Sequence, residues 1–202
     1  DAARHLTSHA VQVLTFEQLE SVVQALRDQG TTVIGPTRRD QTIVHDELTS
    51  LTELPRGAAD EQDGGRYRLV ETGTSEVFAF STPSESWKRF LYPERTLLIR
   101  ARRGDGEVEV TEPEPEADGV AFFGIRSCDL AALDRLDRVF MDPAATDPTY
   151  AARRAATFIV AAACNRPGGT CFCASMNTGP TPSAGYDLMI RELTEPDHRF
   201  VV

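Results

Sequence analysis

This 202-residue chain lacks the features that mark several large classes of protein. It has neither a P-loop nor a G-x-G-x-x-G sequence, so nothing in it indicates nucleotide binding. Its apolar runs are too short to cross a bilayer. Lys88 is the only lysine, and the formal net charge of −10 argues against a nucleic-acid partner, which requires a basic surface. We therefore expect no membrane and no nucleic-acid interaction.

The familiar cysteine patterns of metal proteins are also missing. No C-x-x-C pair occurs, which excludes the usual zinc knuckles and the usual ferredoxin run, and the histidines share no spacing. The first ten residues contain no apolar signal-peptide core. We therefore expect a reducing, cytoplasmic location, where grouped cysteines serve metal or redox chemistry more often than disulfides.

The composition is that of a folded protein, with 41% hydrophobic residues. We expect one α/β domain over residues 1–202. Much of the acidic excess lies in one run that contains no basic residue, and we expect it to form a solvated surface loop. The run consists of Asp105, Glu107, Glu109, Glu112, Glu114, Glu116 and Asp118.

Periodicity predicts a helix over 16–29, begun by a Thr15–Gln18 capping box and ended by Gly30. A strand over 31–34 is expected to stop at Gly35-Pro36. Further predictions are listed in chain order: a strand at 41–45, a polar loop at 55–65, strands at 66–71 and 77–80, a helical turn within 83–93, and a strand at 96–101.

The second half contains the clearest fold signal. The runs Val120–Ile125 and Thr157–Ala163 are continuously apolar, as strands buried on both faces are, and a helix is predicted between them from Asp129 to Phe140. This order predicts a β-α-β unit with parallel strands. Two strands after Gly185 complete the prediction, which is a mixed α/β sheet with at least one parallel β-α-β unit and additional antiparallel strands.

The four cysteines are predicted to meet at one edge of this sheet. Cys128 and Cys164 each follow the carboxyl end of a predicted parallel strand, where ligands of open α/β sheets bind. A tight turn at Gly168-Gly169 can bring Cys171 and Cys173 over the same edge. In an extended C-x-C segment both sulfurs can face one centre. Because Cys128 also lies at a predicted helix start, we expect the helix dipole to lower its pKa.

Several chemistries remain open for these thiols. Four thiolates without a histidine suit a [4Fe-4S] cluster or a structural zinc ion, and loop N–H groups could donate hydrogen bonds to the sulfurs. Alternatively, Cys164 is an ordinary buried thiol in a metal-free scaffold, or Cys128 is a nucleophile. Arg126, two residues before Cys128, is a candidate cofactor-binding residue that could offset cluster charge or contact a partner's cofactor.

Several segments resemble the N-terminal part of the beta subunit of cytoplasmic NiFe sulfhydrogenases and the A subunit of anaerobic sulfite reductases. The resemblance covers about residues 65–193, with a fainter match in V-I-G-P. The segments that carry it are G-R-Y-R-L, K-R-F-L-Y-P-E-R, R-S-C-D-L-A-A-L-D-R-L-D-R-V-F, D-P-T-Y-A-A-R-R and C-N-R-P-G-G-T-C-F-C-A-S-M-N-T-G-P followed by G-Y-D-L.

The resemblance implies an iron–sulfur subunit that passes electrons between an NAD(P)H-oxidising flavoprotein subunit and a NiFe hydrogenase or sulfite reductase catalytic subunit. This chain would then be an electron-transfer component of an oxidoreductase complex and not the place where bonds are made. The resemblance makes Cys128, Cys164, Cys171 and Cys173 the ligands of a [4Fe-4S] cluster. Family members continue into a ferredoxin-like domain whose cysteine runs are absent here. We therefore expect the chain to be the N-terminal part of a longer subunit, with a shortened relative as the alternative.

Overall fold

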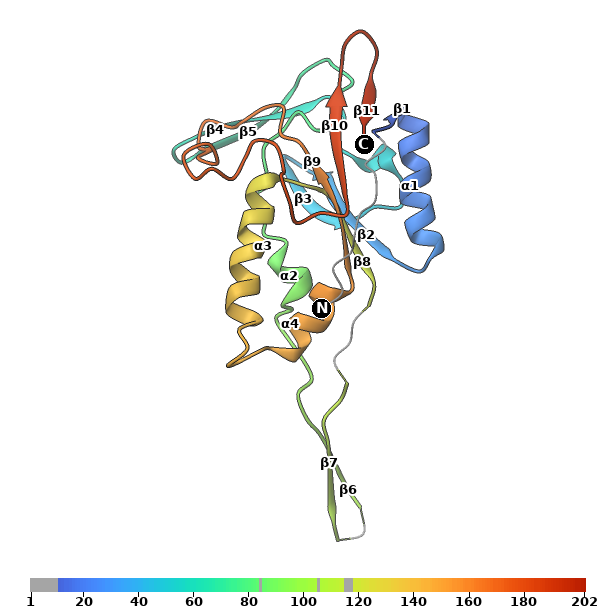
Figure 1. Cartoon of the computed structure of the whole chain (residues 1–202), viewed down its shortest axis with the longest axis vertical. Helices are drawn as coiled ribbons and strands as arrows, with labels where there is room; N and C mark the ends of the chain where they lie inside the picture. The colour runs from blue at the N-terminus through green and yellow to red at the C-terminus, as the bar shows by residue number, and fades with distance from the viewer. Residues whose placement is uncertain (1–10, 84, 105, 115–117) are drawn as a thin grey trace.

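A computed structural model of the chain describes residues 11–83, 85–104, 106–114 and 118–202. Its main element is a seven-stranded mixed sheet in the order β1-β11-β10-β9-β8-β2-β3 (Figure 1). The strands are β1 (Val13–Leu14), β2 (Thr32–Arg39), β3 (Thr42–Glu47), β8 (Val120–Ile125), β9 (Thr157–Ala162), β10 (Leu188–Leu193) and β11 (Arg199–Val201).

The central part of the sheet is parallel, and its borders are antiparallel. Strand β8 pairs in parallel with β9 and with β2, and β9 pairs in parallel with β10. The β2–β3, β10–β11 and β1–β11 pairs are antiparallel. The predicted α/β class is therefore confirmed, as is the parallel β-α-β unit, because β8 and β9 are neighbours joined through the helices α3 (Ser127–Phe140) and α4 (Pro148–Ala155).

The alternation of side chains along the strands places an apolar core on each face of the sheet. Phe123 belongs to the core that includes Leu19 and Val23 of α1 (Phe16–Asp28). Its neighbour Phe122 belongs to the core formed with Trp87 and Leu133, on the side of α2 (Lys88–Leu91), α3 and α4. Since successive strand residues point to opposite faces, the continuous apolar runs are explained by helices that cover both faces.

The predicted start of α1 is confirmed in detail. Thr15 accepts a hydrogen bond from the Gln18 N–H, while the Gln18 side chain accepts one from the Thr15 N–H. Helix α3 begins at Ser127, two residues before its predicted start, so Cys128 lies inside its first turn.

Two predictions in the first half were wrong. Strand β2 continues through Gly35-Pro36 to Arg39. It pairs with β8 only from Thr32 to Ile34, so the missing N–H of Pro36 falls beyond that ladder. The predicted polar loop at 55–65 contains strand β4 (Ala58–Asp63), which pairs with β5 (Arg66–Glu71), and a 3-10 turn spans Leu51–Glu53.

The predicted strand at 77–80 does not form, although all four residues are buried. Side chains replace a strand partner there. The Glu192 carboxylate accepts hydrogen bonds from the N–H groups of Val77 and Phe78, and Arg126 donates to the carbonyl oxygens of Phe78 and Phe80. Buried peptide groups need partners, and here ionised side chains supply them.

A two-stranded hairpin projects from the body, formed by β6 (Arg100–Arg103) and β7 (Val108–Thr111) (Figure 1). The strand predicted at 96–101 is therefore displaced towards the C-terminus. The acidic run is only partly a loop, because Glu109 pairs with Arg102 in the hairpin. Asp105 and Glu116 of that run, like the first ten residues, lie outside the described residues. Every helix within the described ranges is too short or too polar to cross a membrane.

Candidate cysteine site

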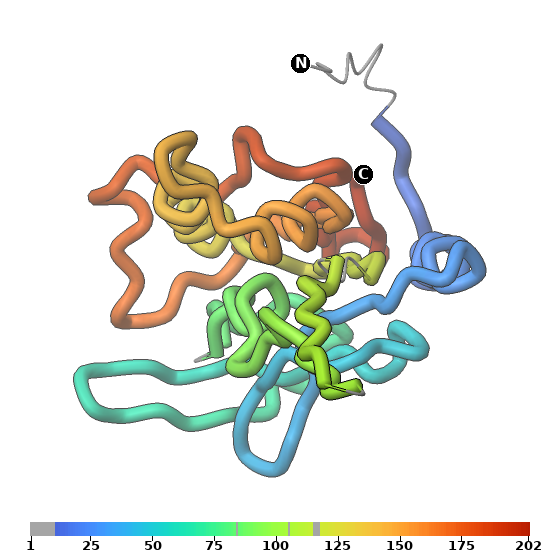
Figure 2. The backbone as a smooth tube through the Cα atoms, turned by 90° about the horizontal axis from the view of Figure 1, so that it is seen from below, coloured from blue at the N-terminus to red at the C-terminus, as the bar shows by residue number. Residues whose placement is uncertain are grey.

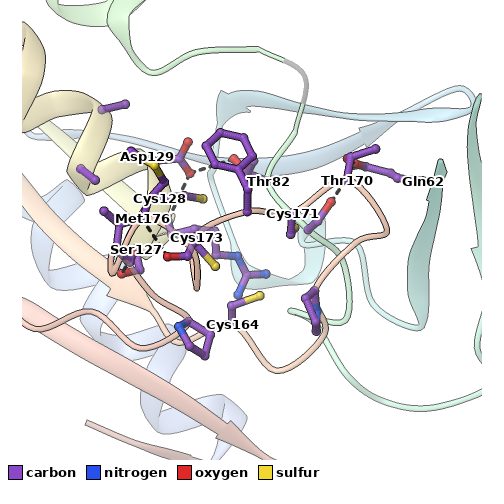
Figure 3. Close-up of a pocket in the computed structure, with 18 of the residues that line it drawn as sticks. Gln62, Thr82, Ser127, Cys128, Asp129, Cys164, Thr170, Cys171, Cys173 and Met176 are labelled. Atoms are coloured by element: carbon purple, nitrogen blue, oxygen red, sulfur yellow. Dashed lines mark hydrogen bonds between the residues drawn. The ribbon is translucent and has the colours of Figure 1, made fainter. Parts of the chain in front are cut away.

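One cavity of about 410 Å³ is lined by all four cysteines. They come from three separate segments: the first turn of α3, the end of β9, and the loop that follows β9 (Figure 3). The expected meeting of Cys128, Cys164, Cys171 and Cys173 at the carboxyl edge of the parallel strands is what the structure shows. Whether they can act as ligands depends on the burial, hydrogen bonds and charge around each thiol.

Cys128 is partly buried within the first turn of α3. Burial, together with a smaller contribution from the neighbouring Asp129 carboxylate, raises the pKa of its thiol to about 12. The expectation of a pKa lowered by the helix dipole is therefore wrong for the metal-free protein, because desolvation exceeds the dipole effect. Asp129 accepts hydrogen bonds from the Arg126 N–H and the Thr82 hydroxyl, so it serves as a capping residue.

Cys164 follows the last residues of β9 and is tied to the far end of the cysteine loop, since its N–H donates to the Pro180 carbonyl oxygen at 3.2 Å. Burial raises the pKa of the Cys164 thiol, while the positive charge of Arg126 opposes that shift. The thiols of Cys171 and Cys173 also raise the pKa of Cys164, and they do the same to Cys128. Cys171 and Cys173 therefore lie close enough to influence the titration of both other thiols.

The predicted turn at Gly168-Gly169 is present, with the Cys171 N–H donating to the Gly168 carbonyl oxygen at 3.1 Å. Position 169 requires glycine, because a Cβ atom there would lie 2.2 Å from the Gln62 carbonyl oxygen of β4. The loop thus lies directly against the β4–β5 hairpin. The Thr170 hydroxyl adds a 2.9 Å hydrogen bond to the Gln62 side chain.

The far side of the loop is fixed to the start of α3. The Ser127 hydroxyl donates to the Thr178 carbonyl oxygen at 2.5 Å. Gly179 passes so close that an added Cβ would lie 3.2 Å from the Cys173 sulfur. The expected donation from a loop N–H to a sulfur occurs at Cys171, whose Sγ accepts from the Gly168 N–H at 3.2 Å.

Arg126 lines the same cavity and is almost fully buried. Its guanidinium donates to the carbonyl oxygens of Ala163, Phe78 and Phe80 at 3.0–3.1 Å. The group also lies over the rings of Phe78 and Phe80, while its Nε has no hydrogen-bond partner among the residues that the structure describes. Burial lowers the pKa of Arg126, and negative charge at Cys164 is the largest influence that opposes this shift.

Sequence reasoning missed three residues that shape this site: Glu192, Gln62 and Ser127. Glu192 is a buried acid on β10, two residues after the buried Ile190 on the same face of the strand. An acidic residue at an inward-facing position of a predicted strand can be identified from the sequence alone and indicates a buried charge with specific partners. No comparable signal marks Gln62, because its contact with the loop depends on tertiary structure.

The donor set of the cavity fits a thiolate-bound metal centre. Among the described residues, the lining provides four thiols and no histidine, and a buried guanidinium there needs negative charge nearby. As the side chains stand, however, the described residues include no group of three or more His, Cys, Asp or Glu side chains arranged to hold a metal ion. Binding would therefore require the thiol side chains to move closer together.

The fold and the cavity together define a class of protein: an α/β domain with a four-thiol pocket at the edge of its parallel strands. Among curated proteins, the chain is similar to sulfhydrogenase 2 subunit beta of Pyrococcus furiosus, with 28% identity over 165 residues, or 81% of this chain. The match covers 40% of that protein, so the chain spans less than half of its relative's length. No family model and no solved structure matches.

Proposed function

We propose that this chain is an electron-transfer domain that holds one [4Fe-4S] cluster through Cys128, Cys164, Cys171 and Cys173. The observation that carries the proposal is the convergence of four thiols, from three segments, on one cavity that also contains a buried arginine. The cluster would supply the capacity to accept and release one electron. The similarity to a sulfhydrogenase beta subunit supports the same proposal.

The residues around the cavity have distinct tasks in this proposal. Arg126 provides positive charge that offsets the negative charge of four thiolates, and its carbonyl partners hold it in place. The Gly168 N–H donates to the Cys171 sulfur, and such hydrogen bonds tune the reduction potential of iron–sulfur centres. With Cys128 half-buried and its pKa raised to about 12, the nucleophile alternative loses its activated thiolate.

We further propose that the domain acts inside a redox complex. The resemblance implies an NAD(P)H-oxidising flavoprotein subunit on one side and a NiFe hydrogenase or sulfite reductase catalytic subunit on the other. A cytoplasmic location accords with free thiols at all four cysteines. In such a complex the chain would relay electrons and perform no bond chemistry of its own.

The test is anaerobic purification followed by metal and sulfide analysis. We expect a brown protein with broad absorbance near about 400 nm and about four iron and four sulfide ions per chain. Changing each cysteine to serine in turn is expected to lower the iron content. Ser175→Ala, in the same loop but outside the cavity lining, is the matched control and is expected to retain iron.

Two results would contradict the proposal. Anaerobically prepared protein that is colourless and free of iron would exclude the cluster. Protein with about one zinc ion and no sulfide would instead establish the structural zinc alternative, in which the same four thiols hold a scaffold together.

A further inference from the structure

The mouth of the cysteine cavity has apolar side chains exposed to solvent. Phe172, between two cysteines, is 70% exposed, and Met176 is 49% exposed. Both line the cavity, and Cys171 beside them is the one exposed cysteine of the four. The four cysteine side chains are therefore least covered by protein where the exposed surface is most apolar.

These side chains are presented by a loop whose two ends are fixed. On one side, the Thr170 hydroxyl donates a hydrogen bond to the Gln62 side chain. On the other side, the Thr178 carbonyl oxygen accepts a hydrogen bond from the Ser127 hydroxyl. Within the loop, the Met176 N–H donates to the Phe172 carbonyl oxygen at 3.2 Å. The exposed apolar pair is thus held at the cavity mouth by the same contacts that hold the cysteines.

Helix α3 continues this surface. Cys128, Ala132 and Arg135 follow one another at helical spacing and all line the cavity, with Ala132 and Arg135 exposed. The other charged lining residues are Arg126, which is almost fully buried, and Asp129, which is partly buried and accepts hydrogen bonds from Thr82 and the Arg126 N–H. In a chain with a net charge of −10, the described mouth is therefore apolar with a cation at its edge.

We propose that this mouth is the docking face for a protein one-electron carrier whose contact surface is apolar in the centre and acidic at its edge. The inference rests on the proposed function, because it assigns a partner to the same centre. Small interfaces are typical of transient redox complexes, and complementary charge raises their association rate. In the transfer, the reduced carrier loses one electron and the cysteine-bound centre gains it, and no bond or proton changes.

The charge part of the proposal is tested by two variants on one helix. Arg135→Glu reverses the charge at the mouth, whereas Arg138→Glu makes the same change at an exposed residue that pairs with Asp134 outside the cavity lining. The probe is photoreduced plant-type [2Fe-2S] ferredoxin, an acidic carrier, and the readout is the second-order rate constant of cluster bleaching in iron-loaded protein. At low salt we expect Arg135→Glu to slow the reaction about tenfold and Arg138→Glu by less than about twofold.

The salt dependence of the rate and a substitution of an exposed apolar residue test the remaining parts of the proposal. The Arg135→Glu effect is expected to shrink in about 0.5 M salt, because screening weakens exposed charges. Met176→Gln is expected to slow transfer about threefold at either salt concentration, through lost apolar contact at the interface. Met141→Gln, a similarly exposed methionine at the end of α3, is the matched control and is expected to have no effect.

The outcomes separate the docking face from the proposed function. Equal effects of Arg135→Glu and Arg138→Glu, or no effect of either, in protein with full iron and sulfide content would overturn the docking face alone. Protein that contains no iron would overturn both inferences together.

Discussion

Arg126 and Glu192 bind the same residue from opposite sides. The Phe78 N–H donates to the Glu192 carboxylate at 2.9 Å, and the Phe78 carbonyl oxygen accepts from the Arg126 guanidinium at 3.1 Å. Two buried and opposite charges are therefore positioned relative to each other through one stretch of backbone. This arrangement fixes the guanidinium beside the cysteine cavity and connects it to Glu192 of strand β10.

Replacing Glu192 is expected to be costly. Glu192→Gln removes the charge that accepts from Val77, Phe78 and His198, and an amide cannot accept at both positions. We expect a loss of about 3 kcal/mol in the free energy of unfolding, measured by urea denaturation. Glu195→Gln, at an exposed position on the following turn, should change it by less than about 0.5 kcal/mol. Similar values for both variants would contradict the arrangement.

Gly169 is expected to tolerate no side chain. In Gly169→Ala the new Cβ would meet the Gln62 backbone oxygen at 2.2 Å, so the loop would have to leave the β4–β5 hairpin. We expect a loss of about 2 kcal/mol in stability and a reduced iron content after anaerobic reconstitution. Gly64→Ala, where no atom of the described residues lies within 4 Å of the added Cβ, is the control. Full iron content in Gly169→Ala would show that the loop's position is immaterial to the site.

His45 gives the fold a predicted dependence on acid. Its ring lies 3.9 Å from the Trp87 ring, and its Nδ1 has no hydrogen-bond partner within the described part of the chain. Burial, with a smaller contribution from Arg89, lowers its pKa from 6.5 to about 4. Because the folded state disfavours the charged form, stability is complete above pH 6.5 and falls as the pH drops towards 4. The loss amounts to about 3 kcal/mol.

The His45 prediction is measured by urea denaturation at pH 7.5 and pH 4.5. His45→Phe keeps a ring against Trp87 and has no titrating group, so its stability should fall less over the same interval. Parallel curves for the wild type and His45→Phe would assign the acid sensitivity to other groups.

Cys128 is expected to be unreactive in metal-free protein. With its pKa raised to about 12, its thiolate fraction at pH 8 is small, whereas Cys171 is exposed. Alkylation with iodoacetamide followed by peptide mass analysis should modify Cys171 at least about tenfold faster than Cys128. Preferential modification of Cys128 would revive the nucleophile alternative.

The parallel strands at the centre of the sheet could be predicted from the sequence because the patterns that specify them are local. The apolar runs at 120–125 and 157–162 and the Thr15 capping box each specify their own element. The segment at 77–80 was misread because its hydrogen-bond partners, Glu192 and Arg126, are distant in the sequence. Strand β4 was missed since Ala58–Asp63 contains few residues typical of strands and depends on pairing with β5.

The meeting of the cysteines was predictable from topology, but their protonation was not. Two parallel strands that end at the same edge bring Cys128 and Cys164 together, whichever residues surround them. The pKa of Cys128 depends on how deeply the loop and α3 bury it, and sequence spacing contains no measure of that burial.

The central claim is tested most directly by X-ray diffraction from anaerobically grown crystals at the iron absorption edge. The account predicts one compact iron peak in the cavity, with the four Sγ atoms of Cys128, Cys164, Cys171 and Cys173 at bonding distance from it. An iron peak that lacks any of these four sulfurs, or a peak at the zinc edge alone, would contradict it.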